Sequence, residues 1–337
     1  MSNPIINIKP LGFPWETQDP FLFCVYHEDH YPEGNTQLGP QADLSNRPLG
    51  NDFQIRDGFR MYHGRQVPGF PAHPHRGFET ITIVNEGMVD HSDSMGAAGR
   101  FGNGDVQWMT AGSGVQHSEM FPLLNQHDKN DLVLFQIWLN LPRKDKLTEP
   151  HFAMLWHEGI PMVEEKDQKN RLSSIKVIAG NWKGRQAPDP APNSWAAPAE
   201  HGVAIYQIKM EANAQLELPV ANPDVNRSIY FYKGDNLKVA GTELNYFKAV
   251  DLVAHQVVTL ENGNAPGEIL LLQGQPIKER VVQHGPFVMN SEQEIYEAMD
   301  DFQRTQWGGW PWPNHEHVHA REKGRFALHA DGKLEEK

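Results

Sequence analysis

The chain has a single cysteine, Cys24, among 337 residues. One cysteine excludes an internal disulfide framework and is typical of a protein in a reducing compartment. No apolar run approaches the roughly 18 residues that a membrane-spanning helix needs. The N-terminal residues also lack the charged and apolar regions of a signal peptide. We therefore expect a cytoplasmic protein that does not enter the membrane.

Positive charge is scarce: 30 Lys and Arg residues stand against 43 Asp and Glu residues, and the net charge is −13. Contacts with phosphates need clustered Lys and Arg. This balance argues against direct binding to nucleic acid.

Long helical patterns are also scarce, whereas turn residues are abundant, with 29 glycines and 25 prolines. Runs rich in β-branched and aromatic residues predict strands at 80–84, 106–109 and 132–139. Helical spacing of apolar residues occurs in Ser291–Arg304, where Asn290 or Ser291 would cap the helix. The sequence therefore predicts an all-β fold with one C-terminal helix.

Two short polar motifs interrupt the apolar strands. His73 and His75 are one residue apart, and so are His117 and Glu119. On a strand, such pairs point to the same face, because side chains alternate with period two. If the two strands face each other, three imidazoles and one carboxylate converge, which is a ligand set for a transition metal. The alternative is a set of hydrogen-bonded histidines inside a barrel.

The text around these motifs resembles the cupin superfamily and, within it, the pirin family. The likeness is carried by HPHRGFETITIVNEGMVDHSDSMG, by GDVQWMTAGSGVQHSEMF and by Gly285–Asn290. It implies a bicupin, made of two antiparallel β-barrels of the double-stranded β-helix type, with the C-terminal helix and an irregular tail.

The resemblance also implies a metal site. Its ligands would be His73, His75, His117 and Glu119, with Fe(II) as the metal and Ni, Co, Mn, Cu or Zn as other divalent candidates. Glu119 would also be the catalytic residue, taking a proton from the substrate. Glu79 fits the general cupin motif but not the pirin-like ligand set, so we interpret it as a residue that orients a histidine.

We expect an N-terminal cupin domain with the metal site at 1–141, a C-terminal cupin domain without one at 142–307, and an irregular tail at 308–337. The segment 187–192 has linker composition, but the resemblance makes it a loop inside the second domain. When the two halves are aligned on Gly87 and Gly234, Val220 and Asn222 take the places of His73 and His75. The second barrel would therefore lack the metal site.

The tail contains His315-Glu316-His317-Val318-His319, which matches the H-E-x-x-H signature of zinc proteases. That chemistry needs both histidines on one face of a helix, and this segment follows a Trp-Pro-Trp-Pro run. We expect it to be neither helical nor catalytic, and we expect the tail to be dispensable for metal binding.

The resemblance implies a dioxygenase that cleaves flavonols such as quercetin at the 2,3-bond, with dioxygen as co-substrate. Met88, Met95, Trp108, Met109, Met120 and Phe121 are candidates either for a flat substrate pocket or for the barrel core. The alternative function is an iron-dependent, redox-sensing coregulator that binds transcriptional or metabolic proteins.

Overall fold

The computed structural model describes residues 3–337, and strands dominate it, as predicted. The chain divides into two compact units. Unit 1 holds the described residues up to Cys24, together with Trp138–Asn140 and Glu158–Lys278. Unit 2 holds Val25–Ile137, Leu141–His157 and Glu279–Lys337. Each unit is described by itself below.

Unit 2 contains the predicted metal motifs. Its strands are β4 (Gly69–His75), β5 (Phe78–Glu86), β6 (Met88–Asp93), β7 (Ala98–Gly102), β8 (Val106–Thr110), β9 (Val115–Met120), β11 (His151–Leu155), β24 (Val282–His284), β25 (Phe287–Met289), β26 (Phe326–Leu328) and β27 (Leu334–Glu336). Two longer strands, β3 (Phe21–Tyr31) and β10 (Asn130–Asn140), lie mostly in unit 2 and continue into unit 1.

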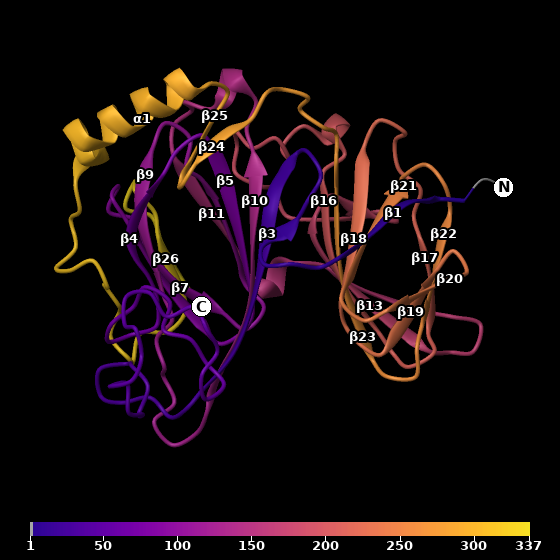
Figure 1. Cartoon of the computed structure of the whole chain (residues 1–337), viewed down its shortest axis with the longest axis horizontal. Coiled ribbons are helices and arrows are strands. Elements are labelled where there is room, and N and C mark those ends of the chain that lie inside the picture. Colours follow the sequence, from indigo (N-terminus) through magenta and orange to yellow (C-terminus); the bar gives the residue numbers. More distant parts are fainter. Residues whose placement is uncertain (1–2) are drawn as a thin grey trace. The chain divides into compact units, whose positions relative to one another are not determined.

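Two sheets form the barrel of unit 2. One has the order β11-β8-β5-β10-β3 and the other β27-β26-β7-β6-β9-β4. Alternate residues of these strands point inward, and Phe101, Met109, Leu134 and Phe152 belong to the core between them. Figure 1 shows β4 and β9 side by side in this barrel, as their register requires. The three core strands predicted from the sequence lie within β5, β8 and β10.

Unit 1 forms the second barrel. Its strands are β1 (Ile5–Pro10), β2 (Trp15–Glu16), β12 (Met162–Lys166), β13 (Leu172–Ala179), β14 (Asn181–Trp182), β15 (Arg185–Gln186), β16 (Ala204–Met210), β17 (Gln215–Leu218), β18 (Asn226–Lys233), β19 (Asn236–Val239), β20 (Thr242–Asn245), β21 (Lys248–Val253), β22 (Val258–Asn262) and β23 (Gly267–Gly274). Eleven of them form a sheet of order β1-β21-β18-β23-β16-β13-β12 and a smaller sheet of order β17-β22-β19-β20, whereas β14 pairs with β15 and β2 pairs with β3. The segment 187–192 is a loop within this unit.

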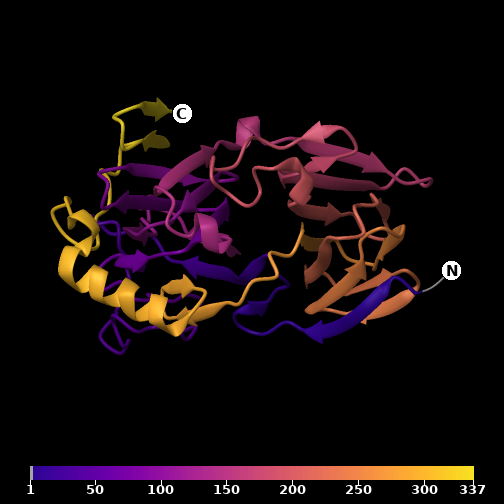
Figure 2. The same ribbon diagram turned by 90° about the horizontal axis from the view of Figure 1, so that it is seen from above.

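The predicted helix is α1 (Glu292–Thr305), and the side chain of Ser291 caps it by accepting a hydrogen bond from the backbone N–H of Glu294. Ile295 and Ala298 are its buried residues, and they pack with Phe287 and Met289 of β25. Figure 2 shows α1 along the outside of the strands of unit 2. Short 3-10 turns complete the chain: η1 (Arg143–Asp145), η2 (His157–Gly159), η3 (Ala199–His201) and η4 (Gln306–Gly308). Within residues 3–337, no helix has the length and apolar character to cross a membrane.

The tail is more ordered than we expected. β26 pairs with β7, with Phe326 opposite Arg100, and β27 pairs with β26. The expectation of irregular structure throughout 308–337 was therefore wrong for these two strands. The reason is that β7 has β6 on one side only, and its other edge is available for pairing.

The order of the units along the chain is not the simple succession that we expected. Residues 279–337, with α1, belong to unit 2, although the sequence suggested that α1 closes the second domain. The boundaries at 141 and 307 stay a prediction about sequence domains.

Candidate metal centre

Strands β4 and β9 bring the two histidine motifs together. They pair antiparallel, so that His73 lies opposite His117 and His75 lies opposite Val115. Between Phe70 and His73 the register shifts, because β4 has one residue more than β9 in this interval. Such a bulge changes the direction in which the side chains point. The bulge places His73 beside His117 and Phe70 opposite Glu119.

The three imidazoles form a compact cluster. The ring centroids of His73 and His117 are 4.5 Å apart, those of His73 and His75 are 4.7 Å apart, and those of His75 and His117 are 4.9 Å apart. One nitrogen from each ring lies within 4.8 Å of the others. The sequence-based expectation that these residues meet in space therefore agrees with the structure.

Burial keeps all three rings neutral at neutral pH. It lowers the pKa of His73 to about 4, with smaller contributions from the nearby His63 and His91. It also lowers the pKa of His75 and of His117 well below the ordinary value, and the neighbouring histidines add to this effect. A neutral imidazole has the lone pair that a metal ligand needs.

The hydrogen bonding of the rings fits a metal ion. Nδ1 of His73 donates to the backbone oxygen of Pro71 at 2.8 Å, so the lone pair is on Nε2. His117 is fully buried, and neither of its ring nitrogens has a hydrogen-bond partner among residues 3–337. A buried polar atom without a partner is costly. A metal ion would supply that missing partner.

Glu119 lies next to the cluster but is held by other side chains. Its Oε2 is 3.8 Å from Nε2 of His117. Its Oε1 accepts a hydrogen bond from Thr82 at 3.0 Å, and its Oε2 accepts one from Gln136 at 2.6 Å. Burial raises the pKa of Glu119, and these hydrogen bonds oppose that effect. In this arrangement the carboxylate can complete the ligand set or accept a proton.

Glu79 is fully buried on β5, and its Oε1 accepts hydrogen bonds from Trp108 at 3.1 Å and Thr110 at 2.7 Å. Both partners belong to β8, so these bonds join the two strands. That Glu79 orients a histidine stays a prediction.

An aromatic wall adjoins the histidines. Phe53 and Tyr62 come from the loop before β4, Phe70 lies on β4, and Phe121 follows β9. Phe70 is 6.3 Å from His73 between ring centroids, 5.1 Å from Tyr62 and 6.1 Å from Phe121. Phe53 extends the wall outward, 6.4 Å from Phe70 and 39% exposed.

A buried polar network holds this wall. The Tyr62 hydroxyl donates to Asp29 at 2.5 Å and lies 2.8 Å from Nδ1 of His27. Arg60 donates to both carboxylate oxygens of Asp29 at 2.9 Å. Tyr62 also has a φ of 57°, a left-handed conformation that is uncommon for a tyrosine. The network therefore fixes the ring of Tyr62 against Phe70.

Comparison with known proteins agrees with this geometry. The Pirin family model matches residues 15–139, and the model of the Pirin C-terminal cupin domain matches residues 205–308. The chain belongs to the pirin family.

Relatives in the pirin family span much of the chain. A protein provisionally named quercetin 2,3-dioxygenase from Pseudomonas aeruginosa is 36% identical over 240 residues, which are 71% of this chain and 79% of that protein. Pirin from Rattus norvegicus is 32% identical over 267 residues, covering 77% and 85% of the two chains. A crystal structure of quercetin 2,3-dioxygenase from Acinetobacter baumannii has a TM-score of 0.70 at 26% identity, covering 92% of this chain and 99% of that one. The two cupin models and the two barrels agree with the predicted bicupin fold.

Two other parts of the chain were considered for metal binding, the second barrel and the segment His315–His319. Within residues 3–337, no candidate metal-ligand group lies wholly in unit 1, and Val220 is 58% exposed. The segment His315–His319 is not helical, as expected, so it does not present its histidines as a zinc protease does. Its His317 stacks on Trp312 at 5.0 Å.

Two further residues of the first pirin motif, His91 and Asp93, lie beside the site. Both are fully buried on β6, and Nε2 of His91 is 3.2 Å from the Asp93 carboxylate. The His91 ring is 5.5 Å from that of His117 between centroids. Both residues are therefore buried next to the histidine cluster and are not part of the protein surface.

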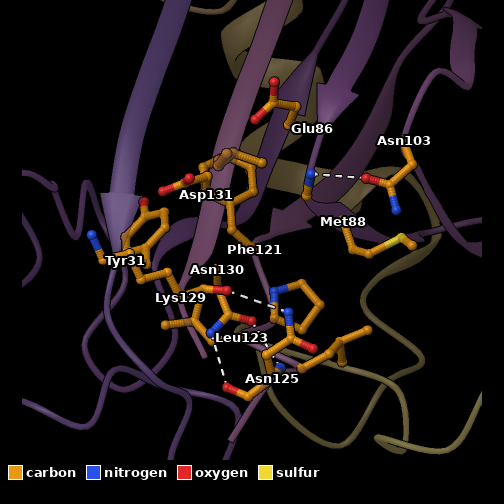
Figure 3. A pocket seen from close by; sticks show the side chains of 14 residues that line it. Tyr31, Glu86, Met88, Asn103, Phe121, Leu123, Asn125, Lys129, Asn130 and Asp131 are labelled. Carbon is orange, nitrogen blue, oxygen red and sulfur yellow. Dashed lines mark hydrogen bonds between the residues drawn. The ribbon is translucent and has the colours of Figure 1, made fainter. Parts of the chain in front are cut away.

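The six residues that we considered for a substrate pocket lie in three settings. Met95 is partly buried and packs against the core of unit 2. Trp108, Met109 and Met120 are fully buried. Met88 and Phe121 line a cavity of about 370 Å³, shown in Figure 3 with Tyr31 and the polar residues of the 129–131 segment around it. Of the aromatic wall, only Phe121 was a candidate from the sequence. Phe53 and Tyr62 come from an irregular loop whose path has no periodic signal in the sequence.

Proposed function

We propose that this protein is a metal-dependent dioxygenase that cleaves flavonols such as quercetin at the 2,3-bond. The observation that carries the proposal is the buried cluster of three neutral imidazoles, in which His117 has no hydrogen-bond partner among residues 3–337, next to an aromatic wall. Such a cluster provides ligands and leaves coordination positions open. The wall provides a surface for a flat aromatic substrate.

The metal would be held by His73, His75 and His117, with Glu119 as the fourth ligand. Three nitrogen donors and one carboxylate suit Fe(II), and they also suit Ni, Co, Mn, Cu or Zn as divalent ions. When bound, the metal supplies the redox-active, Lewis-acidic centre at which a hydroxylated aromatic compound and dioxygen react.

Glu119 would accept the proton of the substrate's hydroxyl group. Its buried carboxylate has a raised pKa, which makes it a stronger base than an exposed glutamate. Thr82 and Gln136 each donate to one of its oxygens, so they hold the carboxylate in a fixed orientation. The same two hydrogen bonds limit how far Glu119 can move toward or away from the histidines.

The aromatic wall would bind and orient the substrate. Phe70 lies between His73 and the rings of Tyr62 and Phe121, so a ring stacked on Phe70 would lie close to the ligands. Packing of apolar rings also excludes water from this side of the site.

The comparisons support the substrate class. The Acinetobacter baumannii structure is named quercetin 2,3-dioxygenase, and so, provisionally, is the Pseudomonas aeruginosa relative. A flavonol and dioxygen are therefore the partners that we propose for this chain, and we propose the cytoplasm as its location.

The test is quercetin turnover by the iron-loaded protein under controlled oxygen, followed by the loss of quercetin absorbance and by detection of carbon monoxide. We expect turnover in the wild type and none in His75→Ala, with the β-sheet circular dichroism spectrum retained. Undiminished turnover in His75→Ala would refute the site. An iron-loaded wild type that leaves quercetin intact would favour the alternative, an iron-dependent coregulator that binds other proteins.

A further inference from the structure

The barrel of unit 1 contains a buried positive charge that no acidic residue balances. Arg227 on β18 is 2% exposed. Its Nε and Nη2 both donate to Oε1 of Gln273, at 2.8 and 2.5 Å. Its Nη1 has no hydrogen-bond partner in the described chain, and no carboxylate there forms an ion pair with it.

This arrangement is unusual for an arginine. Burial lowers the pKa of Arg227 to about 10, which still leaves the guanidinium charged at neutral pH. A buried charge normally has a counter-charge or a full set of hydrogen bonds. The other fully buried arginine of the chain, Arg100, follows this rule, since it pairs with Asp90 and donates to the carbonyl oxygens of His319, Ala320 and Lys323.

Arg227 points into the barrel. Ile229 and Phe231, on the same face of β18, belong to the core of unit 1, and so does Leu271, two residues before Gln273 on β23. Arg227 and Gln273 are directly opposite each other in the register of these strands. Both strands lie in the middle of the larger sheet (Figure 1). The unbalanced charge is therefore part of the barrel interior.

A cavity of about 240 Å³ adjoins this position. Gln273 and Tyr206 both line it, and these are the two residues with which Arg227 interacts. Nε2 of Gln273 donates to the backbone oxygen of Gly202, another lining residue, at 2.9 Å. Gln273 thus both accepts hydrogen bonds from the guanidinium and lines the cavity.

The rest of the lining determines what could enter. Small residues predominate, and the other lining residues are Ala179, Gly180, Asn181, Gln186, Pro188, Asp189, Pro190, Ala196, Ala197, Pro198, Ala199, Val203 and Ala204. Its one acidic member, Asp189, is exposed. The volume is below the roughly 300–1,000 Å³ of pockets for drug-sized ligands. The cavity therefore suits a compact molecule.

We propose that the barrel of unit 1 is a binding site for a small carboxylate anion, which lies against Gln273 and has Arg227 as its counter-charge. A planar carboxylate matches both an amide N–H and the planar guanidinium. This site is independent of the proposed dioxygenase activity, because its residues belong to the other unit. It also gives the barrel without metal ligands a binding role of its own.

The test is a titration of the full-length protein with L-lactate at constant ionic strength, followed by the melting temperature and by isothermal calorimetry. We expect a saturable rise in melting temperature with lactate and none with added chloride. Inorganic phosphate is the second anion in the panel, and a response to phosphate but not to lactate would overturn the assignment to carboxylates.

Two variants test Arg227 directly. Arg227→Met should bind lactate at least roughly tenfold more weakly, and without anion it should be as stable as the wild type, since it removes an unbalanced charge. Gln273→Glu provides a built-in carboxylate, so it should melt at a higher temperature and lose its response to lactate. Asp189→Asn should bind lactate more tightly, because it removes a negative charge beside the cavity.

Three results would overturn the proposal. They are a wild type without a saturable response, a lactate affinity unchanged in both Arg227→Met and Gln273→Glu, and an Arg227→Met protein that is markedly destabilised without anion. The last result would show that the guanidinium only stabilises the pairing of β18 with β23.

Discussion

His73 and His117 lie directly opposite each other on β4 and β9, with their ring centroids 4.5 Å apart. They are in this position because β4 has one extra residue between Phe70 and His73. Without that bulge, a regular antiparallel register would shift His73 relative to His117 and Glu119. The local irregularity of β4 therefore builds the cluster, and it does so at the edge of its sheet, where bulges are common.

Substitution of His117 should remove the metal and leave the fold. His117→Ala deletes an imidazole whose nitrogens have no hydrogen-bond partners among residues 3–337, so it breaks no hydrogen bond. We expect loss of bound metal, measured as metal per chain after loading with Fe(II), and an unchanged circular dichroism spectrum. The matched control is His127→Ala, which changes an exposed histidine of a loop and should retain full metal content. Retention of metal by His117→Ala would exclude His117 as a ligand.

Glu79 should matter more for stability than its place in the cupin motif suggests. Glu79→Ala leaves the indole N–H of Trp108 and the hydroxyl of Thr110 without their recorded acceptor in a buried position. Each such loss costs about 1–3 kcal/mol. We therefore expect a clear fall in the free energy of unfolding, measured in urea. Glu79→Gln keeps an oxygen acceptor and should lose less, and a loss as large as that of alanine would show that the charge itself is needed.

The meeting of the three histidines was predictable from the sequence, whereas their surroundings were not. Period two along a strand is enough to place His73 with His75 and His117 with Glu119. The partners of Glu119 are different, because Thr82 and Gln136 come from β5 and β10 and approach it only after the barrel closes. Tyr62, whose ring contacts Phe53 and Phe70, is likewise held by the buried pair of Asp29 and Arg60, which no local pattern indicates.

The tail is a second case in which a contact between distant segments could not be predicted from a local sequence pattern. A run of Trp and Pro with charged residues has no strand pattern, yet β26 forms because the edge of β7 is available to it. Arg100, buried on β7, donates to four carbonyl oxygens of the tail, those of His319, Ala320, Arg321 and Lys323. Pairing with β7 thus determines that β26 is a strand, although the local sequence of β26 does not predict one.

Removal of the tail should therefore destabilise unit 2, although we expect the tail to be dispensable for metal binding. Deletion of residues 308–337 removes the four carbonyl partners of Arg100 and the backbone N–H that His319 donates to Asp90. We expect a loss of at least about 2 kcal/mol, since each buried group left without a partner costs about 1–3 kcal/mol. The measurement is the urea midpoint, with metal content measured in parallel. An unchanged midpoint would show that the tail does not stabilise unit 2, and a loss of metal would contradict the expectation that the tail is dispensable for metal binding.

The contact of the tail with the barrel should also depend on pH. The hydrogen bond from Lys333, followed by those from Trp156 and His329, lowers the pKa of Glu335 to about 2. A lowered pKa means that the stabilisation is present above the ordinary glutamate value of about 4.3 and is lost as the pH falls toward the folded value. We expect Glu335→Gln to melt below the wild type at pH 6, with the difference shrinking as the pH falls toward 3. A difference that is constant over this range would show that ionisation of Glu335 does not contribute.

The aromatic wall should determine affinity for the substrate without affecting the metal. Phe70 is the wall residue in ring contact with His73, and its side chain forms no hydrogen bond, so Phe70→Ala removes a stacking surface and leaves the ligands in place. A lost aromatic contact of this kind is worth about 0.5–1.5 kcal/mol beyond its buried area, so we expect KM for quercetin to rise roughly tenfold with a smaller change in kcat. Phe70→Leu keeps apolar volume without a ring, so its KM should lie between those of the wild type and Phe70→Ala. Tyr62→Phe should act differently, because it keeps the ring but removes the hydroxyl that joins it to Asp29 and His27. Tyr62→Phe should therefore lower the melting temperature and change KM little. If Phe70→Ala lost metal in proportion to activity, the wall would be part of the ligand scaffold and the substrate would have to bind elsewhere.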